Sequence, residues 1–387
     1  MDIQADGILS KLNGLEIFDT FENFKISAAS DIITLLTPPH IRTLLFTSGM
    51  AEDNIQALSN NSISVLERWL LLEPFLPYVR HCYPLNICLE ALSSIYNLEL
   101  SKFTVDGVNS KLREADENNT RVASVMKKFN VVCVTPYRIN RQNNALPAAF
   151  NMEHFISPEN KSSAELLEKI SGTANNCFDD WVQAVEISVS RLHEQNCCLR
   201  LTRPLEKVSK SSWAGMEDIY KNLMEGKNID KTDFSSYMLA FAFDCARKLK
   251  MTVQLSRGLA LEAMAAHEFF NYYREINFDC FSDDLELAGI CPNFYINTGA
   301  LAAKDPEWTY AFLTRAMNRI PVNKISLASG DFSAPEEAAG FYLSVRRLLA
   351  RFFSERVRWD MNEKQYMYIA GLWLNGVAGG LYHRDYN

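Results

Sequence analysis

The chain has 387 residues, of which 48% are hydrophobic and 22% are charged. This composition is typical of folded globular proteins and excludes collagen-like, low-complexity and extensively disordered chains. The length fits one large or two medium domains. The 39 basic and 47 acidic residues leave a formal net charge of −8, and the basic residues form no long cluster. We therefore expect no nucleic-acid-binding face.

No segment of the sequence is typical of an exported or membrane protein. The first 14 residues lack a basic stretch followed by an apolar one, which a secretory signal requires. No window reaches the roughly 18 uninterrupted apolar residues of a membrane helix. The nine cysteines are an odd number and lie mostly in apolar runs, which is typical of buried free thiols in a reducing compartment. We expect a cytoplasmic protein with no membrane partner.

Short apolar runs recur along the chain with helical segments between them. This alternation predicts βα units around a parallel sheet. An eightfold pattern favours an α/β fold of the (β/α)₈ TIM-barrel class, and a doubly wound open sheet is the alternative. The eight candidate strands are residues 15–19, 130–134, 145–149, 197–201, 251–255, 277–281, 293–297 and 324–328.

Between the first and second candidate strands, residues 27–112 carry apolar residues at helical spacing and almost no strand signal. We expect a helical insertion there, within a single domain of residues 1–387. Later helices have readable ends. Ser162 and Glu165 form a predicted capping box, with Gly172 as the C-terminal residue. Residues 234–249 form another amphipathic helix, and one more starts at 333–336 with a proline in its first turn.

In a (β/α)₈ barrel the chemistry lies at the C-terminal ends of the strands. The six histidines fall outside the predicted strand ends, so an imidazole-ligated metal site is not expected there. Arginine suits a carboxylate or a phosphate, and ordinary salt bridges inside the barrel mouth are the alternative. The candidate ligand-binding residues at the strand ends are Asn151, Arg200, Arg203 and Arg257.

Residues 15–24, LEIFDTFENF, resemble the first strand of the amidohydrolase superfamily, in its uronate-isomerase-like and amidohydrolase-2-like branch. In that family the strand ends in a His-x-His metal motif. Phe21 and Asn23 occupy the histidine positions here. Phenylalanine offers a metal no lone pair, and asparagine offers only a neutral carbonyl oxygen.

Two later segments extend the resemblance. Residues 251–258 resemble the fifth strand, with Ser256 where a histidine ligand belongs. Residues 324–331 resemble the eighth strand, whose terminal aspartate, retained as Asp331, binds metal and moves a proton in the family. With weaker matches near residues 292–297 and 368–382, the resemblance spans about residues 15–382. It implies that Phe21, Asn23, Ser256 and Asp331 converge at one end of a barrel.

The replaced ligands favour a degenerate member of the superfamily, a pseudoenzyme that has lost the metal site. Such a protein would bind a small anionic or sugar-like molecule or a protein partner, and we expect no cofactor. One carboxylate with weak neutral neighbours does not hold zinc, whose sites have three or four ligands. A magnesium or calcium site from Asp279, Asp283, Asp284 and Asp331 is a further alternative, although the first three could equally form a solvated loop or cap a helix.

The main alternative is an active hydrolase, decarboxylase or uronate-isomerase-like enzyme that acts on a carboxylate or sugar acid. Asp331, Glu22 and Tyr137 would then transfer protons, and Arg257 would orient the substrate. Only this alternative requires a divalent metal, zinc, magnesium or manganese. The sequence leaves open the substrate and whether the chain forms a homo-oligomer.

Overall fold

The computed structural model describes residues 3–15, 17–19, 31–97, 99–118, 120–133, 149–195, 197–206, 208, 213, 215–302, 305–327, 334–357 and 361–382. The chain divides into two compact units. The first comprises Met1–Ile139, Gly299–Thr314 and Leu327–Asn375, and the second comprises Asn140–Thr298, Arg315–Ser326 and Gly376–Asn387.

The second unit contains a six-stranded parallel sheet, and its strands follow one another in chain order. Every residue of β4 and β5 is buried. Strands buried on both faces are typical of parallel sheets covered by helices. The strands are β3 (Ala149–Asn151), β4 (Cys198–Leu201), β5 (Thr252–Leu255), β6 (Asn277–Cys280), β7 (Phe294–Asn297) and β8 (Ile325–Ser326).

Helices in the connections between these strands pack on one another around aromatic side chains. Phe178, Trp181, Tyr220 and Phe234 are buried together, and the Trp181 indole donates to the carbonyl of Phe155 at 2.9 Å. The helices are α10 (Glu153–Ile156), α11 (Lys161–Ser171), α12 (Phe178–Glu194), α13 (Met216–Met224), α14 (Thr232–Leu249), α15 (Ala263–Tyr272), α16 (Leu285–Ile290) and, near the C-terminus, α21 (Val377–Tyr382).

In the first unit a short parallel ladder joins β1 (Ile17–Asp19) to β2 (Val131–Cys133). The chain between these strands is helical in the described residues, so the predicted helical insertion after the first strand is confirmed. Its helices are α2 (Ile32–Leu36), α3 (Pro39–Thr47), α4 (Glu52–Leu58), α5 (Val65–Leu72), α6 (Leu76–Val79), α7 (Tyr83–Tyr96), α8 (Val105–Glu117) and α9 (Arg121–Phe129).

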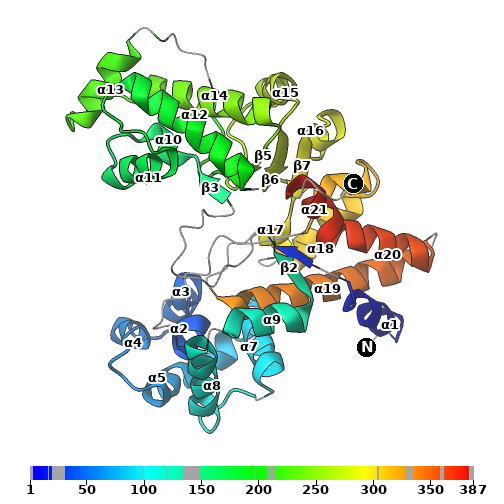
Figure 1. The fold of residues 1–387 in the computed structure, drawn as a ribbon. Helices are drawn as coiled ribbons and strands as arrows, with labels where there is room; N and C mark the ends of the chain where they lie inside the picture. Colours follow the sequence, from blue (N-terminus) through cyan, green and yellow to red (C-terminus); the bar gives the residue numbers. More distant parts are fainter. Residues whose placement is uncertain are drawn as a thin grey trace. The chain divides into compact units, whose positions relative to one another are not determined.

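The 23-residue helix α19 (Pro335–Val357) is the long central element of the first unit, and α7, α9 and α1 (Ile3–Leu12) pack on it (Figure 1). Buried Glu336 at its start accepts from Arg121 Nη2 at 2.8 Å and from the Tyr96 hydroxyl at 2.9 Å. This cluster fixes the N-terminal end of α19. The unit also contains α17 (Gly299–Ala302), α18 (Pro306–Ala316, up to Thr314) and α20 (Glu363–Gly371).

The predicted strands overlap all eight observed ones, but the third is displaced. The prediction placed it at residues 145–149, whereas β3 starts at Ala149 and includes Phe150 and Asn151, which were predicted to follow the strand. Phe150 is buried, and Asn151 pairs with Arg200 in register. The ladder with β4 therefore determines where this strand begins, and an apolar run alone does not show it.

Helix ends were predicted with mixed success. Gly172 ends α11 with φ of +69°, as predicted. The predicted capping box at Ser162 is wrong, because α11 begins two residues earlier than predicted and Asn160 caps it by accepting from the Ser162 backbone N–H at 3.0 Å. Asparagine is as good an N-cap as serine. The helix predicted at 234–249 is observed as α14.

The described cysteines agree with the prediction of mostly buried, free thiols. Eight cysteines are free, and six of these are buried. Among the described helices, none combines the length and the apolar character needed to cross a bilayer.

Candidate functional site: a polar row and an arginine pair at the strand ends

A row of polar side chains crosses the sheet of the second unit. Asn151 is in register with Arg200, Arg200 with Gln254, and Gln254 with Asp279. Residues in register on parallel neighbouring strands point to the same face of the sheet. Each of these residues is the third in its strand, so the row lies toward the C-terminal ends of the strands.

Several side chains donate hydrogen bonds to one buried carboxylate oxygen of this row, Asp279 Oδ2. Asp279 Oδ2 accepts from Gln254 Nε2 and from Asn297 Nδ2, both at 3.2 Å, and from the Tyr382 hydroxyl. Arg200 Nε donates to Gln254 Oε1, which connects the guanidinium to the carboxylate through the amide. All five side chains are buried. The C-terminal helix α21 thus contributes Tyr382 to a cluster whose other members come from four consecutive strands.

Burial dominates the electrostatics of this cluster. It raises the pKa of Asp279 above its ordinary value, although the hydrogen bonds from Tyr382, Asn297 and Gln254 and the charge of Arg200 act in the opposite direction. Burial and the neighbouring carboxylate also raise the pKa of Tyr382 far above its ordinary range, so the phenol keeps its proton and donates it. Asp279 Oδ1 accepts no hydrogen bond from the described residues.

These groups do not fit the divalent metal that the amidohydrolase resemblance implies. Asp279 Oδ2 already accepts three donors, and Gln254 and Asn297 turn their NH₂ groups toward it. The nearby Arg200 guanidinium would repel a cation. In the part of the chain that the structure describes, no three His, Cys, Asp or Glu side chains gather as a metal site.

The predicted alternative of a magnesium or calcium site stays a prediction, although the aspartates that the structure describes do not gather as a ligand group. Asp284 accepts from the backbone N–H groups of Glu286 and Leu287 and so caps α16, and Asp283 is exposed. Neither joins Asp279 in a ligand group. Asp331 lies outside the described residues.

The segments that follow β4 and β5 remain hydrogen-bonded to each other after the paired residues of the two strands end. Ser256 N–H donates to the Leu201 carbonyl at 3.1 Å, and Leu205 N–H donates to the Gly258 carbonyl at 3.1 Å. A parallel bridge then joins Leu205 to Leu259. Gly258 has φ of +70°, a conformation that glycine adopts without strain. The segments after β4 and β5 are thereby held together at the C-terminal ends of the two strands.

This arrangement brings two of the predicted ligand-binding residues to equivalent positions. Arg203 and Arg257 each lie two residues after the paired Leu201 and Leu255, and two residues before the bridge. Arg257 is exposed. Arg203 has a side chain that is 36% exposed, and its Nε lies 3.5 Å from Glu153 Oε1. Two guanidinium groups on adjacent strand ends, with one partly exposed carboxylate beside them, can receive an anion.

The other described candidates have structural partners. Asn151 Oδ1 accepts from the Glu153 N–H at 3.0 Å and from the Thr202 hydroxyl at 3.2 Å, so it organises the start of α10. The Ser256 hydroxyl donates to the Leu201 carbonyl at 2.9 Å and fastens β5 to β4. Arg200 is buried in the polar row rather than exposed at the barrel mouth. Glu22, Tyr137, Asp331, Phe21 and Asn23 lie outside the described residues, so their predicted convergence stays a prediction.

Sequence reasoning missed Gln254, Asn297 and Tyr382 as members of the buried cluster. A weak signal was present, because Gln254 and Asn297 are polar residues within buried strands, at positions that share a face with Asp279. Tyr382 carried no such signal, because it follows Asp279 by 103 residues and only the folded chain brings them together.

Comparison with known proteins places this geometry in a known fold. No family model matches the sequence, and no curated protein matches it. Uronate isomerase from Thermotoga maritima superposes with a TM-score of 0.73 at 12% identity, over 99% of this chain and 98% of that one. The chain has the uronate isomerase fold.

Two further solved structures agree with this result. Glucuronate isomerase from Caulobacter crescentus gives a TM-score of 0.71 at 12% identity, over 100% of this chain and 96% of that one. A Lactobacillus casei protein, provisionally assigned as a metal-dependent hydrolase, gives 0.62 at 11% identity over 98% of each chain. The predicted (β/α)₈ class and the uronate-isomerase-like resemblance are confirmed at the level of the fold.

Proposed function

We propose that this uronate isomerase-fold protein binds a small sugar acid at the C-terminal ends of β4 and β5, and that it does so without a metal site of the amidohydrolase type. The observation that carries the proposal is the matched pair Arg203 and Arg257 beyond two adjacent parallel strands. Structurally similar proteins are named for their action on uronates, which are sugars that carry a carboxylate.

Arg257 is the main anchor for the carboxylate in this proposal. A guanidinium presents two parallel N–H donors that match a carboxylate, and such charge-assisted bonds are stronger than neutral ones. Arg203 would share the anion. Its contact with Glu153 is long and partly exposed, and pairs of this kind contribute little to stability, so a ligand can replace it at low cost.

The proposed absence of a metal site is supported by the side chains that would have to act as metal ligands. The described strands β4 to β7 offer a buried arginine and two amides around one carboxylate, and the resemblance places Phe21, Asn23 and Ser256 where ligands would stand. Ser256 is tied to the backbone of β4. This protein is therefore a degenerate, ligand-binding member of its fold group in our proposal.

The binding site is tested by isothermal titration of the full chain with D-glucuronate and D-galacturonate. We expect saturable binding that Arg257→Gln weakens by about tenfold or more, the loss of one strong bidentate contact. Arg274→Gln is the matched control, because Arg274 is exposed and precedes β6, at the opposite edge of the sheet. Equal affinity in wild type and Arg257→Gln would show that the anion binds elsewhere.

The alternative of an active, metal-dependent sugar-acid isomerase, hydrolase or decarboxylase is favoured by the full-length likeness to enzymes. Metal analysis of the purified protein separates it from the proposal. Stoichiometric zinc or manganese that Asp331→Ala removes, together with uronate isomerisation that is lost in the same variant, would overturn the metal-free account.

A further inference from the structure

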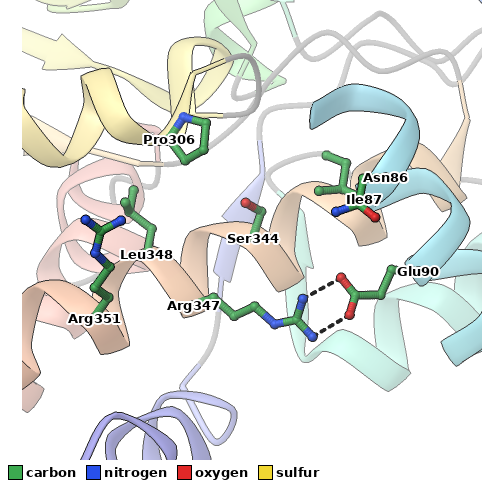
Figure 2. A pocket seen from close by; sticks show the side chains of 8 residues that line it. All are labelled: Asn86, Ile87, Glu90, Pro306, Ser344, Arg347, Leu348 and Arg351. Carbon is green, nitrogen blue, oxygen red and sulfur yellow. Dashed lines mark hydrogen bonds and ion pairs between the residues drawn. The ribbon is translucent and has the colours of Figure 1, made fainter. Parts of the chain in front are cut away.

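The first unit contains a pocket of about 210 Å³ between α7, α18 and α19 (Figure 2). Ile87, Leu348 and Pro306 provide apolar surface, one from each helix. Asn86 and the mostly buried Ser344 add polar atoms. Sites for small molecules are typically mostly apolar with a few polar groups that fix orientation, and this lining has that character.

Two arginines one helical turn apart flank the pocket, and each is paired with a carboxylate from another helix. Arg347 makes a two-pronged pair with Glu90 of α7, with Nη2 and Oε1 2.5 Å apart (Figure 2). Arg351 pairs with Glu307 of α18 and lies over the Tyr310 ring at 4.7 Å from its centre. The arginine side chains are about half exposed, so these pairs contribute little to stability and can be exchanged.

The wall formed by α7 and α19 is fixed by close backbone packing. A Cβ at Gly340 would lie 2.8 Å from the carbonyl oxygen of Ile87, so the two helices approach as only glycine permits. Ile87 lines the pocket and Ser344 lies one turn after Gly340. The pocket is therefore shaped by the packing of the unit and needs no ligand to form.

The geometry points to a second binding site, for a small carboxylate with an apolar ring or branched body. Benzene enters a dry protein cavity of about 150 Å³, so a pocket of about 210 Å³ accommodates one ring and a carboxyl group. The ring would lie against Ile87, Leu348 and Pro306. The carboxylate would replace Glu90 on Arg347, where the planar guanidinium already holds a carboxylate in two-pronged geometry.

The test is titration of the full chain with benzoate, followed by isothermal calorimetry and by saturation-transfer NMR. We expect saturable binding, with saturation transfer to the ring protons, that Arg347→Gln weakens by about tenfold or more. Asn86→Phe keeps both ion pairs and fills the pocket from an exposed position, so it should abolish binding even if Arg347→Gln perturbs α19. Circular dichroism confirms that each variant is folded.

Controls distinguish this site from a general attraction of anions to the surface. Arg113→Gln removes an exposed arginine of α8 and should leave benzoate affinity unchanged. Benzyl alcohol, which has the ring without the charge, should bind more weakly than benzoate. Binding that survives both Arg347→Gln and Asn86→Phe, equal loss in Arg113→Gln, or no saturation by benzoate would overturn the proposal. None of these residues belongs to the sugar-acid site, so the two proposals fail separately.

Discussion

Two buried ionisable side chains, Asp279 and Lys324, are each held by several hydrogen bonds. Asp279 accepts from two amides and a phenol. Lys324 Nζ donates to the carbonyls of Cys291 and Phe294, at 3.1 and 3.2 Å, and lies 4.3 Å from the centre of the Tyr295 ring. Removing a charge from water is costly, and such bonds offset much of that cost. Substitutions at these residues should therefore have effects that depend on pH.

The Tyr382 hydroxyl is predicted to stabilise the ionised form of Asp279. We expect Tyr382→Phe to lower the free energy of unfolding by about 1.5–3 kcal/mol, the usual contribution of a hydrogen bond to a charged group. The loss should shrink as the pH falls through the raised pKa of Asp279, because a protonated carboxyl group is a poorer acceptor. Urea unfolding of wild type and Tyr382→Phe at a series of pH values measures the difference in the free energy of unfolding.

Tyr78→Phe serves as the control for that experiment, because Tyr78 is 64% exposed. A loss in Tyr382→Phe that stays constant over the whole acidic range would contradict the assigned interaction.

Lys324 should make the protein more stable as the pH rises. Burial lowers its pKa from an ordinary value of 10.5 to about 8. Between these two values the unfolded chain binds more protons than the folded one, so the free energy of unfolding increases with pH over that window. From pH 7.5 to 10.5, we expect the free energy of unfolding of the wild type to rise by about 1–3 kcal/mol more than that of Lys324→Gln. Urea unfolding of both proteins measures this difference. Parallel pH profiles of the two proteins would show that Lys324 is not responsible.

At the scale of elements, the sequence predicts those strand positions and helix ends that depend on neighbouring residues in the chain. Short apolar runs with breakers located most strands, and Gly172 marked the end of α11 because a left-handed residue there favours glycine. The start of β3 could not be read, because its register with β4 and not its own composition decides it. The cap of α11 was misassigned between Asn160 and Ser162, since both residue types suit that position.

The packing of α7 on α19 predicts contrasting effects for two helical glycines. Gly340→Ala places a methyl group 2.8 Å from the Ile87 carbonyl oxygen, and the helices must shift to admit it. We expect a loss of about 1–3 kcal/mol, the usual cost of overpacking. Gly107→Ala in α8 meets nothing within 4 Å and should instead gain about 0.5–1 kcal/mol through helix propensity.

Urea unfolding of the two glycine variants and the wild type gives both values directly. Equal stability of Gly340→Ala and wild type would mean that α7 and α19 do not pack as closely as described.

At the scale of the whole molecule, the chain shares its fold with proteins to which it is only 11–12% identical. The eightfold alternation and the family resemblance led to this fold from sequence, because parallel strands and their connecting helices follow hydrophobic periodicity. Arg203 and Arg257 could be found as strand-end residues, although the bridge that aligns them could not. The buried cluster around Asp279 depends on contacts between distant parts of the chain, which no local pattern encodes.

We propose that a sugar acid binds beside Arg203 and Arg257 without a metal. The most direct measurement is calorimetric titration of EDTA-treated full-length protein with D-glucuronate, repeated after addition of zinc or manganese. We expect saturable binding of equal affinity in both conditions. Binding that occurs only after the metal is restored would contradict it.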